Sequence, residues 1–245
     1  MAVNGVGGIA GYVWVDQNGE YYLKNSYNEG NITGESCVGG ITSTISTSAT
    51  NSNILVTLSN CYNKGIITGR GAGRVGGVVG IIAGKISVEY SYNLGEINNT
   101  GGINIGGVVG VNRISTGASS DIKPTINYCY NSADVISTGS VTGVGGLVGS
   151  NQKYACVKNC RRLITAEVKN GSTVASTAYG SSSNNYTGRL IGNCYDTNAP
   201  YIENVYNWEE EGMPTVYNVV NGLSDEESTY WSNTDVNAPE LLWEK

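Results

Sequence analysis

Short apolar segments recur along the chain, and each is followed by the same glycine-rich phrase. The clearest copy begins at Tyr62-Asn63, continues through two isoleucines at 66–67 and ends on Val-Gly-Gly-Val-Val-Gly at 75–80. Related copies begin at Tyr27, Tyr92 and Tyr130 and lead to the glycine pairs at 39–40, 106–107 and 145–146. A repeat with a period of a few tens of residues is typical of a stacked architecture, in which each copy forms one unit. The pattern therefore predicts a series of stacked coils.

Alignment of the copies places apolar residues in columns. These columns are Ile32, Ile67, Ile97, Val135 and Val168; Val38, Val75, Ile105 and Val144; and Ile41, Val78, Val108, Leu147 and Leu190. A neighbouring column is mostly polar and consists of Asn31, Ile66, Glu96, Asp134 and Glu167. Side chains alternate between the two faces of a strand, so the apolar columns should face a core and the polar column should face solvent.

The columns predict an all-β fold: a parallel β-solenoid (β-helix) with a right-handed coil, loop insertions and a C-terminal cap. We expect solenoid repeats over residues 1–207, regular to about residue 151 and degenerate after it. The acidic segment 208–245 is the expected cap, in which Leu241, Leu242 and Trp243 cover the last coil. The chain begins in mid-repeat at Met1-Ala2, so we also expect a longer natural polypeptide whose upstream part covers the first coil.

The tyrosines and glycines of the repeat are assigned structural roles. Glycine inside a strand is unfavourable unless the backbone bends or is approached closely, so the glycine pairs predict a tight corner in each coil. The Tyr-Asn phrases, with later returns at Tyr195 and Tyr206, could form a sugar-stacking stripe, but a stacked ladder is the favoured interpretation. The residues given structural roles are Tyr62, Asn63, Gly76, Gly77, Tyr92, Gly106, Gly107, Tyr130, Gly145 and Gly146.

Four of the six cysteines share one column of small residues. The column consists of Ser26, Cys61, Ser91, Cys129, Cys160 and Cys194. Neighbouring strands would hold the Cβ atoms about 4.8 Å apart, whereas a disulfide prefers ~3.8 Å. We therefore expect free, buried thiols that act as small apolar groups. The absence of any Cys-x-x-Cys spacing argues against a metal cluster, and no cofactor is expected.

Composition narrows the function classes. Charged residues make up 14% of the chain, the formal net charge is −6, and histidine is absent. The lack of histidine removes the commonest general base and most zinc sites. A mildly acidic chain without a basic stripe argues against a nucleic-acid partner. No apolar run approaches the ~18 residues that suggest a membrane-spanning helix.

Ser/Thr/Asn-rich or proline-containing stretches at 42–58, 111–126 and 172–185 interrupt the repeat and are expected to be loops let out of the coils. Loops on a rigid scaffold are where binding chemistry usually lies. The candidate ligand-display residues in and beside these stretches are Thr44, Thr47, Asn51, Asn53, Ser115, Ser119, Asp121, Tyr179, Asn184 and Tyr186.

The Val-Gly-Gly-Val-Val-Gly and Gly-Leu-Val-Gly phrases, after Tyr-Asn-x-Gly-x-Ile-x-Gly, resemble the GLUG-motif repeats of bacterial surface proteins. Such repeats occur in adhesin-like proteins and in accessory regions of IgA-cleaving metallopeptidases. The resemblance covers residues 5–149 well and 160–207 loosely; it departs after Gly40, where Ile41-Thr42-Ser43 follows, and at Arg189, which replaces a glycine. The peptidase signature His-Glu-x-x-His cannot occur in a chain without histidine. The resemblance implies an exported cell-surface module and identifies no ligand.

The leading hypothesis is a non-catalytic extracellular module of a bacterial surface protein, an adhesin or stalk whose loops bind a host glycan or host protein. One alternative is a β-helix lyase or glycosidase, for which Glu96, Asp134 and Glu167 are the candidate carboxylates. A structural component of an extracellular or phage fibre, with self-association, is a further alternative. Binding of ice or mineral through threonine ladders is disfavoured, because the Thr/Ser tracts lie in the insertions.

Overall fold

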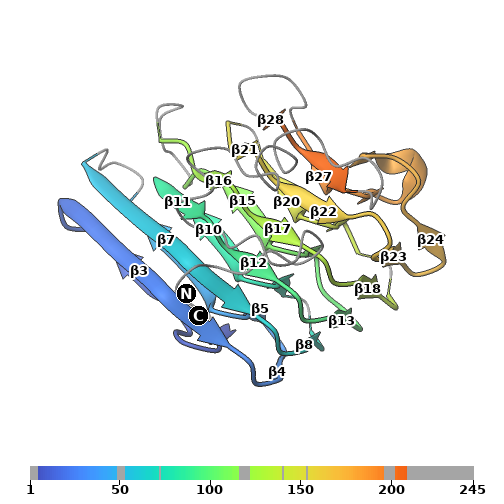
Figure 1. Ribbon diagram of the computed structural model, residues 1–245, viewed down its shortest axis with the longest axis horizontal. Helices are drawn as coiled ribbons and strands as arrows, with labels where there is room; N and C mark the ends of the chain where they lie inside the picture. Colours follow the sequence, from blue (N-terminus) through green and yellow to red (C-terminus); the bar gives the residue numbers. More distant parts are fainter. Residues whose placement is uncertain are drawn as a thin grey trace, which may run out of the picture.

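A computed structural model of the chain describes residues 5–48, 53–71, 73–115, 122–139, 141–152, 154–195 and 202–208. These residues form short strands and one 3₁₀ turn, η1 (Ser182–Asn184). Strands from successive coils lie side by side in parallel, which confirms the predicted parallel β-solenoid (Figure 1). The hand of the coil stays a prediction.

Two sheets begin each coil. Sheet A contains β1 (Gly5–Gly7), β5 (Cys37–Gly39), β9 (Arg74–Gly76), β14 (Asn104–Gly106), β19 (Val144–Gly145) and β26 (Thr187–Gly188). Sheet B contains β2 (Val13–Val15), β6 (Thr42–Thr47), β10 (Val79–Ala83), β15 (Val109–Arg113), β20 (Val148–Asn151), β27 (Ile191–Cys194) and β25 (Tyr179–Gly180).

Two further sheets complete the coil. Sheet C contains β3 (Gly19–Asn28), β7 (Ile54–Asn63), β11 (Ile86–Glu89), β12 (Tyr92–Asn93), β16 (Thr125–Asn127), β17 (Tyr130–Asn131), β21 (Cys156–Lys158), β22 (Arg161–Leu163), β28 (Ile202–Glu203) and β29 (Tyr206–Trp208). Sheet D contains β4 (Ile32–Gly34), β8 (Ile67–Gly69), β13 (Ile97–Asn99), β18 (Val135–Ser137), β23 (Val168–Asn170) and β24 (Thr173–Val174). The pair β23–β24 is antiparallel.

The register of the strands confirms the predicted apolar columns. Ile67 pairs with both Ile32 and Ile97, and the same column continues through Val135 to Val168. These side chains form one core cluster with the column of Val38 between sheets A and D. A second cluster fills the space between sheets B and C. Stacked aliphatic side chains, each almost fully buried, therefore supply the hydrophobic stabilisation of every coil.

The glycine pairs lie at the corner between sheets A and B, as predicted, and the cause is close approach of other atoms. A Cβ on Gly77 would lie 2.1 Å from the carbonyl oxygen of Gly107 and 2.3 Å from Cγ of Asn93. At Gly107 the same position is taken by the carbonyl of Gly146 and the side chain of Asn131. The second glycines at positions 40, 77 and 107 thus make room for the asparagine of a Tyr-Asn phrase.

The predicted insertion at 42–58 is largely strand. Thr44 and Thr47 lie in β6 and are buried, so the prediction of a loop beginning at residue 42 is wrong. Threonine is β-branched and fits a strand, and the Thr47 hydroxyl accepts a hydrogen bond from the amide of Lys85 at 3.2 Å. Ser115 is also buried, and its hydroxyl donates to the carbonyls of Thr47 and Ala83.

The cysteine and tyrosine columns need one correction each. Cys61, Cys129 and Cys160 are buried, as expected, and none of the six cysteines forms a disulfide. Cys194, however, pairs with Asn151 in sheet B and does not belong to the small-residue column. Tyr195 follows it, and its amide donates to the carbonyl of Asn151, so it lies outside the tyrosine column. The register continues from Tyr130 through Arg161 to Tyr206. The predicted cap beyond residue 208 lies outside the described residues.

Candidate functional site

The tyrosine column forms a stack that is exposed at its first ring, Tyr27, and buried at the three rings that follow. Successive ring centroids from Tyr27 through Tyr62 and Tyr92 to Tyr130 are 5.0, 5.0 and 4.8 Å apart, with interplanar angles of 9° or less. Tyr62, Tyr92 and Tyr130 are each at most 5% exposed. Rings buried on both sides by their neighbours cannot serve as a sugar platform, so the structural interpretation of the tyrosine column is confirmed.

The asparagines that follow these tyrosines form a parallel ladder. Each side-chain amide donates to the Oδ1 of the asparagine in the next coil, at 2.7 Å from Asn28 to Asn63, 2.7 Å from Asn63 to Asn93 and 2.8 Å from Asn93 to Asn131. The same amides donate to backbone carbonyls two residues ahead, such as that of Gly95. Buried polar groups that are satisfied in this way fix the register of the coils.

In the coil after Tyr130-Asn131, arginines replace both the tyrosine and the asparagine of the two ladders. Arg161 pairs with Tyr130 and Arg162 pairs with Asn131, and each arginine is 2% exposed. The side chain of Arg162 runs beneath the next glycine corner, where a Cβ on Gly146 would lie 2.1 Å from its Cδ. In the following corner, Arg189 stands in place of the second glycine. The substitutions that end the regular repeat therefore bring two arginines to one place.

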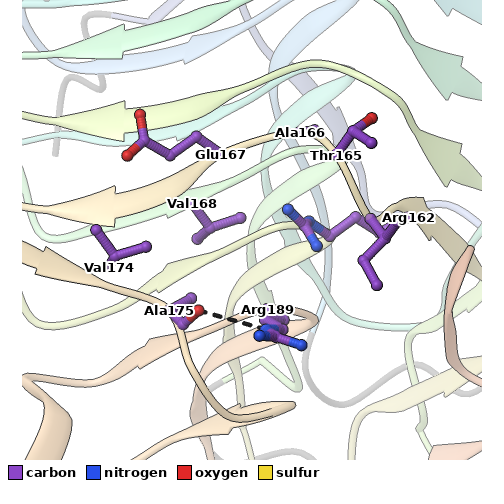
Figure 2. A pocket seen from close by; sticks show the side chains of 9 residues that line it. Arg162, Thr165, Ala166, Glu167, Val168, Val174, Ala175 and Arg189 are labelled. Atoms are coloured by element: carbon purple, nitrogen blue, oxygen red, sulfur yellow. Dashed lines mark hydrogen bonds between the residues drawn. The ribbon is translucent and has the colours of Figure 1, made fainter. Parts of the chain in front are cut away.

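An insertion closes a pocket over these arginines. After β23 the chain turns at Gly171 (φ 59°), forms β24 and returns, and the amide of Ala175 donates to the carbonyl of Val168 at 2.9 Å. The resulting cavity has a volume of about 290 Å³. Its lining consists of Arg162, Ile164, Thr165, Ala166, Glu167, Val168, Val174, Ala175 and Arg189, and Figure 2 labels all of them except Ile164.

The charges in the pocket are unbalanced. Nη1 of Arg162 donates to Oδ1 of Asn207 at 3.2 Å, while its buried Nε has no hydrogen-bond partner among the described residues. Burial, helped by the positive charge of Arg189 and opposed by Asp134, lowers the pKa of Arg162 to about 10. Nε of Arg189 donates to the carbonyl of Ala175 at 3.4 Å. Within the described ranges, no ion pair joins Glu167 to either arginine.

The residues predicted from the sequence to display a ligand lie in different environments. Asn53 is exposed, and its carbonyl accepts a hydrogen bond from the amide of Gly19. The predicted insertion at 172–185 contains β24, β25 and η1, with Tyr179, Asn184 and Tyr186 half-buried. The Asn184 side chain is used internally, since it bonds the Ser181 amide and the Thr177 hydroxyl. Asn51, Ser119 and Asp121 lie outside the described residues. The predictions missed Arg162 and Arg189 as site residues.

The column of carboxylates lies on the outside of sheet D, as predicted. Glu96 and Glu167 are exposed, and Asp134 is half-buried. Oδ1 of Asp134 accepts a hydrogen bond from the amide of Glu167 at 2.5 Å, so this carboxylate ties two coils together. Among the residues that the structure describes, no group of three His, Cys, Asp or Glu residues could hold a metal ion. In the same ranges, no helix is long and apolar enough to cross a membrane.

Comparison with known proteins gives a structural relative. No protein-family model and no curated protein matches the chain. Among solved structures, the chain is similar to a crystal structure of a putative immunoglobulin A1 protease from Bacteroides ovatus, with a TM-score of 0.69 and 18% sequence identity. The match covers 100% of this chain and 65% of that one, so this chain spans less than two thirds of the relative's length. At this identity the similarity shows the fold, while the GLUG-type repeat stays a prediction.

Proposed function

We propose that this chain is a non-catalytic extracellular β-solenoid module of a longer bacterial surface protein, an adhesin or stalk that presents binding surfaces on a rigid stack. The observation that carries the proposal is the paired ladder of stacked tyrosines and hydrogen-bonded asparagines through successive coils. The hydrogen bonds and ring contacts of these ladders form in one register only, so they hold neighbouring coils in a fixed position relative to one another. Such a stack can carry a binding surface at a set position.

The chemistry of the chain supports an accessory role rather than a proteolytic one. The similar structure is described as a putative immunoglobulin A1 protease, and the similarity covers 65% of its length. This chain contains no histidine, so it cannot supply a His-Glu-x-x-His zinc site. The Asp134 carboxylate, one of the three candidate carboxylates for a lyase or glycosidase, accepts a hydrogen bond from the backbone of the next coil. We therefore assign the described coils to scaffolding and binding.

The first coil supports the proposal that the module belongs to a longer stack. Its outer edge carries exposed apolar side chains, among them Ile9 at 49%, Trp14 at 51% and Tyr27 at 49% exposure. An open strand edge with apolar side chains recruits another strand or chain. We propose that a further coil of the same polypeptide covers this edge.

The test measures the rigidity of the coil stack and its activity on immunoglobulin A1 in the same sample. Small-angle scattering should fit the coil stack as a rigid particle, and immunoglobulin A1 incubated with the protein should be recovered intact by mass spectrometry. A heat-denatured sample serves as the control for contaminating protease. Specific cleavage of immunoglobulin A1, or a scattering profile of a flexible chain over the described coils, would overturn the proposal.

A further inference from the structure

We propose that the pocket between Arg162, Arg189 and the β24 turn binds the carboxylate of a sugar acid. The choice of a sugar as the ligand rests on the proposed surface function, whereas the carboxylate follows from the pocket itself. The cavity brings the guanidinium of Arg162, a residue that is 2% exposed, and the guanidinium of Arg189 to one space of about 290 Å³.

The first argument is the unmet charge and hydrogen-bonding capacity of the arginines. Arg162 is 2% exposed, yet its Nε has no hydrogen-bond partner in the described ranges. Arg189 faces the same cavity and raises the cost of keeping Arg162 charged. Asp134 offsets only part of the cost of this buried charge, and a carboxylate in the cavity that accepts bidentate hydrogen bonds from a guanidinium group lowers the cost further. Figure 2 shows both guanidinium groups on one side of the cavity.

The second argument is the chemistry of the remaining walls. Ile164, Ala166, Val168, Val174 and Ala175 give an aliphatic surface, which an inorganic anion would leave in contact with water. Thr165 and Glu167 add polar groups at the exposed side of the pocket. A ligand that fits has a carboxylate for the arginines, an apolar patch for the aliphatic wall and hydroxyl groups that donate to Glu167. Uronic and sialic acids have this combination.

The carboxylate could also come from the chain itself. Asn207, the partner of Arg162, is followed after Trp208 by Glu209-Glu210-Glu211. The chemistry is the same for a glutamate side chain and for a sugar acid, so the experiment must separate the two sources. Replacement of the three glutamates with glutamine removes the internal source and leaves the pocket residues unchanged.

The experiment is a titration of the full chain with glucuronate and N-acetylneuraminate, followed by protein-observed NMR. Glucose and N-acetylmannosamine are the neutral controls. We expect saturable shifts with the acids alone, and Arg189→Gln should weaken the affinity about tenfold or more, because a charge-assisted hydrogen bond is lost. Arg70→Gln removes the same charge at an exposed position and should leave the affinity unchanged.

A second variant guards against misfolding of the arginine variant. Val174 is 55% exposed at the pocket, so Val174→Tyr should fill the pocket without disturbing the core, and it should abolish binding. Equal binding of acids and neutral sugars, or full affinity in both pocket variants, would overturn the inference. Binding seen only after the Glu209-Glu210-Glu211 replacement would assign the pocket to the chain's own carboxylates and overturn it too. Cleavage of a bound glycan would instead contradict the proposed non-catalytic function.

Discussion

Replacement of Asn93 with alanine tests the asparagine ladder at its centre. The Asn93 side chain is fully buried and takes part in four hydrogen bonds, which join it to Asn63, to Asn131 and to both backbone groups of Gly95. A net contribution of ~1 kcal/mol for each bond predicts a loss of about 4 kcal/mol in the free energy of unfolding. Water cannot replace these bonds, because the Tyr-Asn phrases of both neighbouring coils cover the site.

Asn28→Ala is the matched control for this prediction. Asn28 makes the same two amide bonds, to the Gly30 carbonyl and to Asn63, but it lies on the first coil, where water can replace them. Its loss should cost about 1 kcal/mol. Urea titrations followed by circular dichroism would compare the two variants with the unmodified chain. Equal destabilisation by the two substitutions would refute the argument that buried amide pairing holds the coils in register.

Three further predictions follow from the packing. Gly77→Ala should lower the free energy of unfolding by ~3 kcal/mol or more, because its Cβ would overlap the Gly107 carbonyl. Gly30→Ala, whose Cβ would lie 3.6 Å from the nearest atom, should change the free energy of unfolding by less than about 0.5 kcal/mol. Urea titration measures both values. Iodoacetamide at pH 8 should label half-buried Cys194 first and the other five cysteines, which are buried, only after unfolding. Burial also raises the pKa of Cys61 to about 12, which keeps its thiol protonated. Labelling of Cys61 at the rate of Cys194 would be inconsistent with this core. Sugar-acid binding should weaken as the pH rises through about 10, because Arg162 loses its charge there. The charged groups around Arg162 are Arg189, Asp134 and Glu167. NMR titrations at pH 8 and pH 10.5 would give the same affinity if Arg162 played no part in binding.

The sequence predicted the coil stack because the core residues recur at equivalent positions of each repeat. Ile67, Val75 and Val78 each belong to an apolar column that the structure confirms. The looser match at Val168 also pairs in register. The glycine corner was predicted in place, with close approach of another backbone as one possible reason for it. Only the fold shows that Gly77 leaves room for Asn93 from a different phrase of the repeat.

The candidate site was harder to predict, because its residues break the repeat. Thr44 and Thr47 looked like loop residues by composition, yet threonine also suits a buried strand. Arg162 and Arg189 were visible as departures from the asparagine and glycine of the pattern. Nothing in the sequence alone placed them together, since they come from successive coils and an insertion separates them.

The most direct test of the account is the fate of acidic glycans incubated with the full chain. Bound and free fractions are separated, and each is analysed by mass spectrometry. A binding module without catalysis predicts that glycans with terminal sugar acids are retained on the protein and recovered intact, and that Val174→Tyr abolishes their retention. Shortened or unsaturated products that accumulate with time would contradict the account and show that the coils carry an enzyme.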